Sequence, residues 1–134
     1  MASTDTHIDI GIVVRDIDAC LPFYRDVIGL KVLADFKGAR GTHLWMLACG
    51  PCMVKLVTHE PTPEPANPPG GTYGGTGLRY WTMGVDDIDA AVAKCEAAGA
   101  PIPVPVTEIA PRTRIAMIED PEGNVVEFLE TAPR

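Results

Sequence analysis

Two short stretches decide the fold of this chain: VRDIDA at residues 14–19 and VDDIDA at residues 85–90. Each stretch follows an apolar run and precedes a helical pattern, and their starts lie 85 − 14 = 71 residues apart in a chain of 134. Similarity at a fixed offset is the sequence signature of a repeated structural unit. The sequence therefore predicts two copies of one supersecondary unit, each about half of the chain.

The first copy places a helix between strands. Residues 8–14 form a β-branched run that is typical of a buried strand. A helix follows, with Asp18 as the expected N-cap and Gly29 as the expected end. Three further strands are expected at 30–36, 43–48 and 53–58. The unit is thus βαβββ.

The second copy repeats this order. A strand is expected at 78–85, a helix from Asp89 to Ala98, and strands at 102–106, 114–119 and 125–129. The architecture that follows is one domain over residues 1–134, with module one at 7–60 and module two at 78–131.

The segment between the copies, residues 61–77, holds ten of the 26 glycines and prolines. This composition predicts a linker that is stiff at its proline end and loose at its glycine end. A lid over a pocket, with Tyr73 at its tip, is the alternative to a plain connector.

The composition narrows the possible functions. With 11 basic and 18 acidic residues and a net charge of −7, the chain lacks the basic surface that nucleic-acid binding requires. Its apolar stretches are too short to cross a membrane. Because the first residues carry no secretory signal, we expect a cytoplasmic protein with reduced cysteines. CGPC at residues 49–52 has redox-motif spacing, but that chemistry needs a helix N-terminus, and the flanking strand patterns predict a turn.

The repeat, FYRDVIGL at residues 23–30 and DPEGNVVE at residues 120–127 together resemble the vicinal oxygen chelate superfamily. This group contains glyoxalases, bleomycin-resistance proteins and extradiol dioxygenases. The resemblance covers roughly residues 7–130. It implies an α+β fold of two tandem βαβββ modules, curled into an incomplete barrel around a cup-shaped site. It also implies a homodimer that binds a small molecule.

The resemblance further implies which side chains lie in the cup. Metal-using members supply four, one from the first and one from the last strand of each module, usually His, Gln or Glu. Carried over position by position, the set in this chain is Asp9, Lys55, Tyr80 and Glu127. A different turn length would place Leu56 in the position of Lys55.

Strand alternation adds further candidates, because residues two apart share a face. His7 joins Asp9, and Thr82 joins Tyr80. His43 and Trp45 also share a strand face, so they line the pocket if that face looks into the cup.

The four carried-over residues are unusual metal ligands. A lysine ammonium has no lone pair, and a neutral tyrosine is a weak ligand. Asp9 and Glu127 remain as oxygen ligands that would hold Mg²⁺ or Mn²⁺ loosely. The sequence leaves two alternatives for the cofactor: a divalent metal ion on these two carboxylates, or none.

Two functions follow. The first is a lyase or isomerase that acts on a carbonyl or hydroxylated substrate through an enolate-like state. Glu127 would be the general base, with Lys55 or Tyr80 stabilising the enolate or donating a proton. The second is a bleomycin-resistance-type protein that binds and sequesters a drug or metabolite. A buried ion pair of Lys55 with Glu127 or Asp9, without any chemistry, is the structural alternative.

Overall fold

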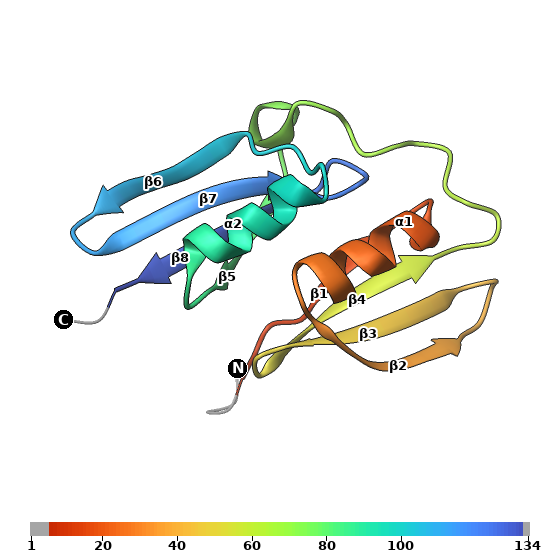
Figure 1. Ribbon diagram of the computed structural model, residues 1–134. Coiled ribbons are helices and arrows are strands. Elements are labelled where there is room, and N and C mark those ends of the chain that lie inside the picture. The colour runs from red at the N-terminus through yellow and green to blue at the C-terminus, as the bar shows by residue number, and fades with distance from the viewer. Residues whose placement is uncertain (1–5, 133–134) are drawn as a thin grey trace. The chain divides into compact units, whose positions relative to one another are not determined.

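A computed structural model describes residues 6–132, which contain two copies of a βαβββ arrangement (Figure 1). The chain divides between Pro65 and Ala66 into two compact units. Each unit holds one four-stranded sheet, with strand order β1-β4-β3-β2 in the first and β5-β8-β7-β6 in the second. The prediction of an α+β fold built from a repeated unit is confirmed.

The first unit contains one sheet and one helical crossover. Its elements are β1 (Ile10–Val13), α1 (Ile17–Pro22), the π-helical turn η1 (Phe23–Val27), β2 (Lys31–Lys37), β3 (His43–Cys49) and β4 (Cys52–Thr58). β1 and β4 are parallel neighbours, whereas β2, β3 and β4 pair antiparallel. Parallel neighbours cannot be joined by a tight turn, and here the helix and two strands lie between them in the chain.

Both helices begin two residues earlier than the sequence predicted. The N-caps are Asp16 and Asp87, whose carboxylates accept hydrogen bonds from the N–H three residues on, at 3.2 and 3.0 Å. The predicted caps, Asp18 and Asp89, lie instead in the first helical turn. Negative charge is favourable there because the helix dipole is positive at its N-terminus.

The first helix also changes form along its length. α1 ends at Pro22, and the π-helical turn η1 continues from Phe23. Proline removes a backbone donor and its ring crowds the preceding turn, which is a recognised cause of irregular helix geometry. Beneath the helix lies the core of the unit, made of the buried residues Ile12, Val14, Cys20, Phe23, Tyr24, Leu30, Leu47, Val54 and Leu56.

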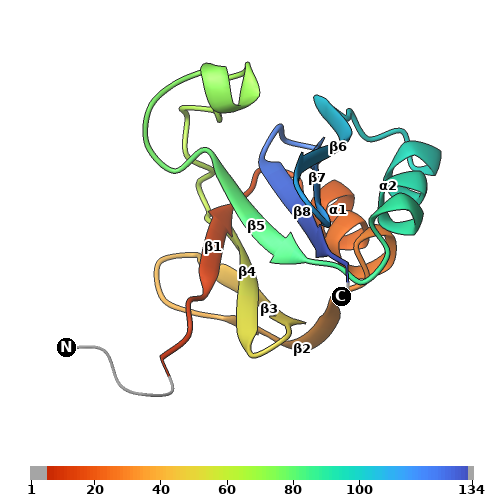
Figure 2. The ribbon, with the colours of Figure 1, turned by 90° about the vertical axis from the view of Figure 1, so that its left-hand side faces the viewer.

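The second unit repeats the design with a longer helix. Its elements are the 3-10 turn η2 (Gly71–Tyr73), β5 (Tyr80–Gly84), α2 (Ile88–Ala97), β6 (Val104–Ala110), β7 (Thr113–Glu119) and β8 (Val125–Thr131). Figure 2 shows the loop that carries η2 and leads into β5. No helix within residues 6–132 combines the length and apolarity needed to cross a membrane.

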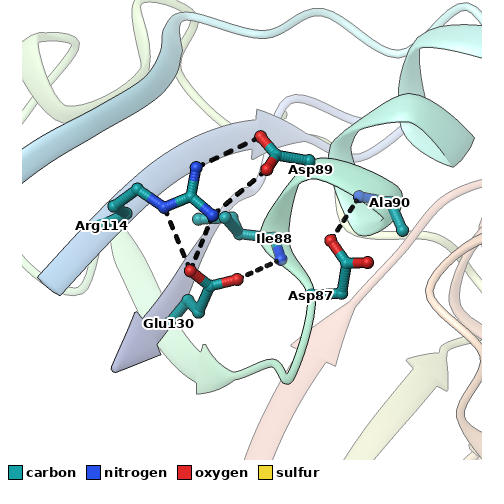
Figure 3. Close-up of polar contacts among 6 residues, drawn as sticks. All are labelled: Asp87, Ile88, Asp89, Ala90, Arg114 and Glu130. Carbon is teal, nitrogen blue, oxygen red and sulfur yellow. Dashed lines mark hydrogen bonds and ion pairs between the residues drawn. The ribbon is translucent and has the colours of Figure 1, made fainter. Parts of the chain in front are cut away.

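An ionic network fixes α2 against its sheet (Figure 3). Arg114 on β7 donates to Glu130 Oε1 on β8 at 2.8 and 3.0 Å and lies 3.1 Å from Asp89. The other oxygen of Glu130 accepts the backbone N–H of Ile88 at 2.9 Å. This hydrogen bond, together with the one from Arg114, lowers the pKa of Glu130. One carboxylate thus satisfies a helix N-terminus and a guanidinium together.

The segment 61–77 is less loose than its composition predicted. The Arg79 guanidinium donates to the Gly71 carbonyl at 2.7 and 2.9 Å and to the Pro68 carbonyl at 2.9 Å. Asn67 donates to the Glu122 carbonyl at 3.1 Å. The glycine end is therefore held onto the second unit by hydrogen bonds, because a single guanidinium supplies several donors in a fixed fork.

Candidate functional site

Asp9 and Lys55 come together in the first unit. Asp9 Oδ2 lies 3.8 Å from Lys55 Nζ. The other oxygen, Oδ1, accepts the backbone N–H of Met53 at 2.9 Å and lies 3.6 Å from His7 Nε2. The Asp9 carboxylate is therefore already paired with a cation and with a backbone donor.

Strand pairing explains this contact. In the parallel β1–β4 pair, Gly11 lies directly opposite Lys55, and Ile12 opposite Leu56. Gly11 has no side chain, and a Cβ added there would meet nothing within 4 Å, so the face beside Lys55 is open at this position. Ile12 and Leu56 are buried, so they point toward the core. The register therefore favours Lys55 over Leu56 as the residue beside Asp9.

We call the two faces of the first sheet the helix-covered face, which carries Ile12 and Leu56, and the open face, which carries Gly11 and Lys55. Sequence reasoning did not anticipate two features of the open face. One is the Met53 N–H that holds Asp9. The other is the clearance at Gly11. Neither has a sequence signal, because a backbone donor and an absent side chain become meaningful only once the strand register is known.

Tyr80, Thr82 and Glu127 share one face of the second sheet. Thr82 and Glu127 are direct partners in the parallel β5–β8 pair, and Thr82 Oγ1 donates to Glu127 Oε1 at 2.8 Å. Tyr80 lies two residues before Thr82 and is 50% exposed. This face lies opposite the one that carries the Arg114–Glu130 network. We call it the open face of the second sheet. It presents a phenol, a hydroxyl and a carboxylate.

His43 and Trp45 do not lie on the same face as Lys55. Trp45 pairs with Leu56 across β3 and β4, whereas Lys55 pairs with Met46. The His43 and Trp45 rings stack at 3.7 Å with an interplanar angle of 15°, and His43 Nε2 lies 3.0 Å from Asp35 Oδ1. His43 and Trp45 therefore lie on the helix-covered face of the first sheet. Alternation along one strand shows which residues share a face, but not which face the helix covers.

The donor set does not fit a divalent ion. In residues 6–132, no three His, Cys, Asp or Glu side chains come together as metal ligands. Asp9 is the carboxylate of the first unit at a family ligand position, and the Lys55 ammonium lies 3.8 Å from it. An ammonium at that distance repels an added cation and offers it no lone pair.

A hollow of the second unit lies elsewhere. Its volume is about 390 Å³, and it is lined by Pro111, Arg112, Thr113, Thr131 and Ala132. These residues include none of the acid, base or metal-ligand candidates named above. The open faces, rather than this hollow, carry the carboxylates, the ammonium and the phenol that the sequence singled out.

Comparison with known proteins agrees with this architecture. The sequence profile of the Glyoxalase/Bleomycin resistance protein/Dioxygenase superfamily matches residues 6–128. A glyoxalase family protein from Bacillus cereus has a TM-score of 0.81 at 19% identity, over 98% of this chain and all (100%) of that one. Lactoylglutathione lyase from Agrobacterium tumefaciens is 28% identical, with a TM-score of 0.66 over 93% of this chain and 92% of that one. TnmS3, an antibiotic binding protein from Streptomyces sp. CB03234, is 25% identical, with a TM-score of 0.66 over 95% and 97%.

Proposed function

Because the chain belongs to the glyoxalase/bleomycin resistance protein/dioxygenase superfamily, we propose that it binds and sequesters a small organic molecule without a divalent metal ion. The ligand is held at the open face of the first sheet, by Asp9 and Lys55. The open face of the second sheet offers its own polar groups, which are Tyr80, Thr82 and Glu127. His7, beside Asp9, is a further ligand contact.

One observation carries this proposal: the Lys55 ammonium lies 3.8 Å from the Asp9 carboxylate. Lys55 occupies a position that holds a metal ligand in metal-using members of the family. Its ammonium supplies the positive charge that a metal ion would otherwise supply. An ammonium is a hydrogen-bond donor, so it recognises a ligand oxygen rather than coordinating it.

The open faces carry both signs of charge. Lys55 offers N–H donors to a carbonyl, carboxylate or phosphoryl oxygen, whereas Asp9 and Glu127 accept from a ligand amine or amide. The net charge of −7 favours the approach of a cationic ligand through long-range attraction. The likeness to an antibiotic binding protein supports a ligand of drug size with several polar groups.

Metal-free bleomycin is the first probe, because the family description names it. The protein is titrated calorimetrically with this probe in excess chelator. A panel of cationic and neutral antibiotics is then titrated in the same way. We expect stoichiometric binding and recovery of the unchanged ligand by mass spectrometry. Lys55→Met should weaken binding about tenfold or more, as loss of a charged hydrogen bond does. Lys31→Met, on exposed β2, is the matched control and should bind normally. Binding that appears only after a divalent ion is added would contradict the proposal.

A second candidate function is proton abstraction by Glu127, in a lyase or isomerase acting on a carbonyl or hydroxylated substrate. The hydrogen bond from Thr82 favours it, because 2.8 Å fixes the carboxylate on the face that also carries the Tyr80 phenol. A positioned carboxylate and a nearby acid are the parts that enolate chemistry needs.

Deuterium exchange separates the two functions. Lactoylglutathione, suggested by the likeness to a lactoylglutathione lyase, is incubated with the protein in D₂O. Catalysis predicts loss of the NMR signal of the proton next to the carbonyl, and Glu127→Gln should abolish this loss. A sequestering protein returns the probe with its proton in place. Exchange that survives in Glu127→Gln would remove Glu127 as the base.

A further inference from the structure

Cys49 and Cys52 face each other across a tight hairpin turn. They are direct partners in the antiparallel β3–β4 pair, and only Gly50 and Pro51 separate them. Both are free thiols and half-buried. Directly opposed residues hold their Cβ atoms about 5 Å apart and on the same side of the sheet. Two sulfur atoms are therefore presented side by side from rigid backbone.

The turn itself keeps this geometry fixed. Gly50 has a φ of +57°, a conformation that L side chains rarely adopt, and Pro51 has its φ locked by its ring. The strands continue from both cysteines for six further residues each. A ligand that takes two sulfur atoms thus finds them already positioned, so little conformational entropy is lost on binding.

The hairpin setting changes what the two thiols can do. Burial raises the pKa of Cys49, and the neighbouring Cys52 raises it further, because two thiolates repel. Thiol–disulfide exchange needs an accessible thiolate, so this setting disfavours the redox role that CGPC suggests by spacing. Binding of a thiophilic centre does not need a free thiolate beforehand, since the thiol protons leave as the bonds to sulfur form.

We propose that Cys49 and Cys52 form a bidentate dithiol site for thiophilic trivalent metalloids, with organoarsenic(III) oxides as the ligand class. Both S–H bonds break, two As–S bonds form, and the oxide oxygen leaves as water with the two hydrogens. Arsenic stays trivalent and no electrons are transferred. The site is separate from the open face, because Cys49 has the strand alternation of Trp45 and lies on the opposite side from Lys55.

Phenylarsine oxide tests this site on the full chain. The protein is reduced, freed of reductant, checked for titratable thiols and then exposed to the reagent under native conditions. Intact mass spectrometry should show the gain of one phenylarsine oxide less one water per chain. The adduct should resist excess glutathione, a monothiol, and be removed by the dithiol 2,3-dimercaptopropanol. A chelate needs both sulfur atoms, so Cys49→Ser and Cys52→Ser should each weaken binding about 100-fold or more.

The remaining cysteines give an internal control. Cys20 and Cys95 are fully buried at 0% exposure and remain in both variants. Circular dichroism and urea midpoints establish that each variant is folded. A folded, reduced wild-type protein that takes up no glutathione-resistant phenylarsenic group would overturn the proposal. So would an adduct of undiminished affinity in Cys49→Ser or Cys52→Ser.

Discussion

The Asp9–Lys55 ion pair makes a quantitative prediction. Two unit charges about 4 Å apart attract by about 1 kcal/mol in water and by about 4 kcal/mol at the effective dielectric of a protein surface. The side chains are 35% exposed for Lys55 and 20% for Asp9, so solvent screens the pair in part. Exposed pairs measure about 0.2–1 kcal/mol. We therefore expect a coupling energy of about 1 kcal/mol, which should fall as salt is added.

A double-mutant cycle measures this coupling by urea unfolding. Lys55→Met keeps the aliphatic stem, and Asp9→Asn keeps an amide oxygen for the Met53 N–H, so the cycle isolates the charges. Lys31→Met combined with Asp9→Asn is the control cycle and should show no coupling, because Lys31 lies on the far edge strand. A coupling below about 0.3 kcal/mol, within the error of additivity, would refute the view that the ammonium neutralises Asp9.

Three further predictions follow from the packing. Leu56→Ala should destabilise the protein by about 2–5 kcal/mol, measured by urea unfolding, because Leu56 is 0% exposed and the lost side chain leaves a cavity. The backbone hydrogen bond from Ile88 lowers the pKa of Glu130, so its stabilising effect should be full above the ordinary carboxyl pKa and vanish as the pH falls through the lowered value. The gap between the urea midpoints of wild type and Glu130→Gln should close over that acidic range, and a constant gap would contradict this. Gly41→Ala should cost about 1–3 kcal/mol in the same assay, since Gly41 has a φ of +68° and a Cβ would lie 2.5 Å from the Glu60 carbonyl oxygen.

The fold could be predicted because its signals are local and repeated. The stretches at 14–19 and 85–90 combine a strand end, a cap and a helix start, and finding them twice fixed the order of elements. The turn between Cys49 and Cys52 was predicted from its two flanking strand patterns and is confirmed. Helix starts were misplaced because each stretch offers more than one aspartate to cap the helix, and Asp16 and Asp87 are the ones that accept the N–H three residues on.

The candidate site was less accessible to sequence reasoning because it depends on pairing between distant strands. Asp9 meets Lys55 only because β1 and β4 are parallel neighbours in a particular register. The same register turns Trp45 away from Lys55, which alternation within one strand could not show. Ile8, expected to be buried in the first strand, lies before β1 and is 71% exposed. The homodimer and the cytoplasmic location stay predictions.

Metal binding by the protein with Cys49→Ser and Cys52→Ser tests the central claim most directly, because these changes remove the thiols that would bind soft ions by themselves. The protein is dialysed against Mn²⁺, Ni²⁺ or Zn²⁺ at neutral pH, and its metal content is measured by mass spectrometry. With Lys55 beside Asp9, we expect far less than one ion per chain. One ion per chain, lost again in Asp9→Asn or in Glu127→Gln, would contradict a metal-free site.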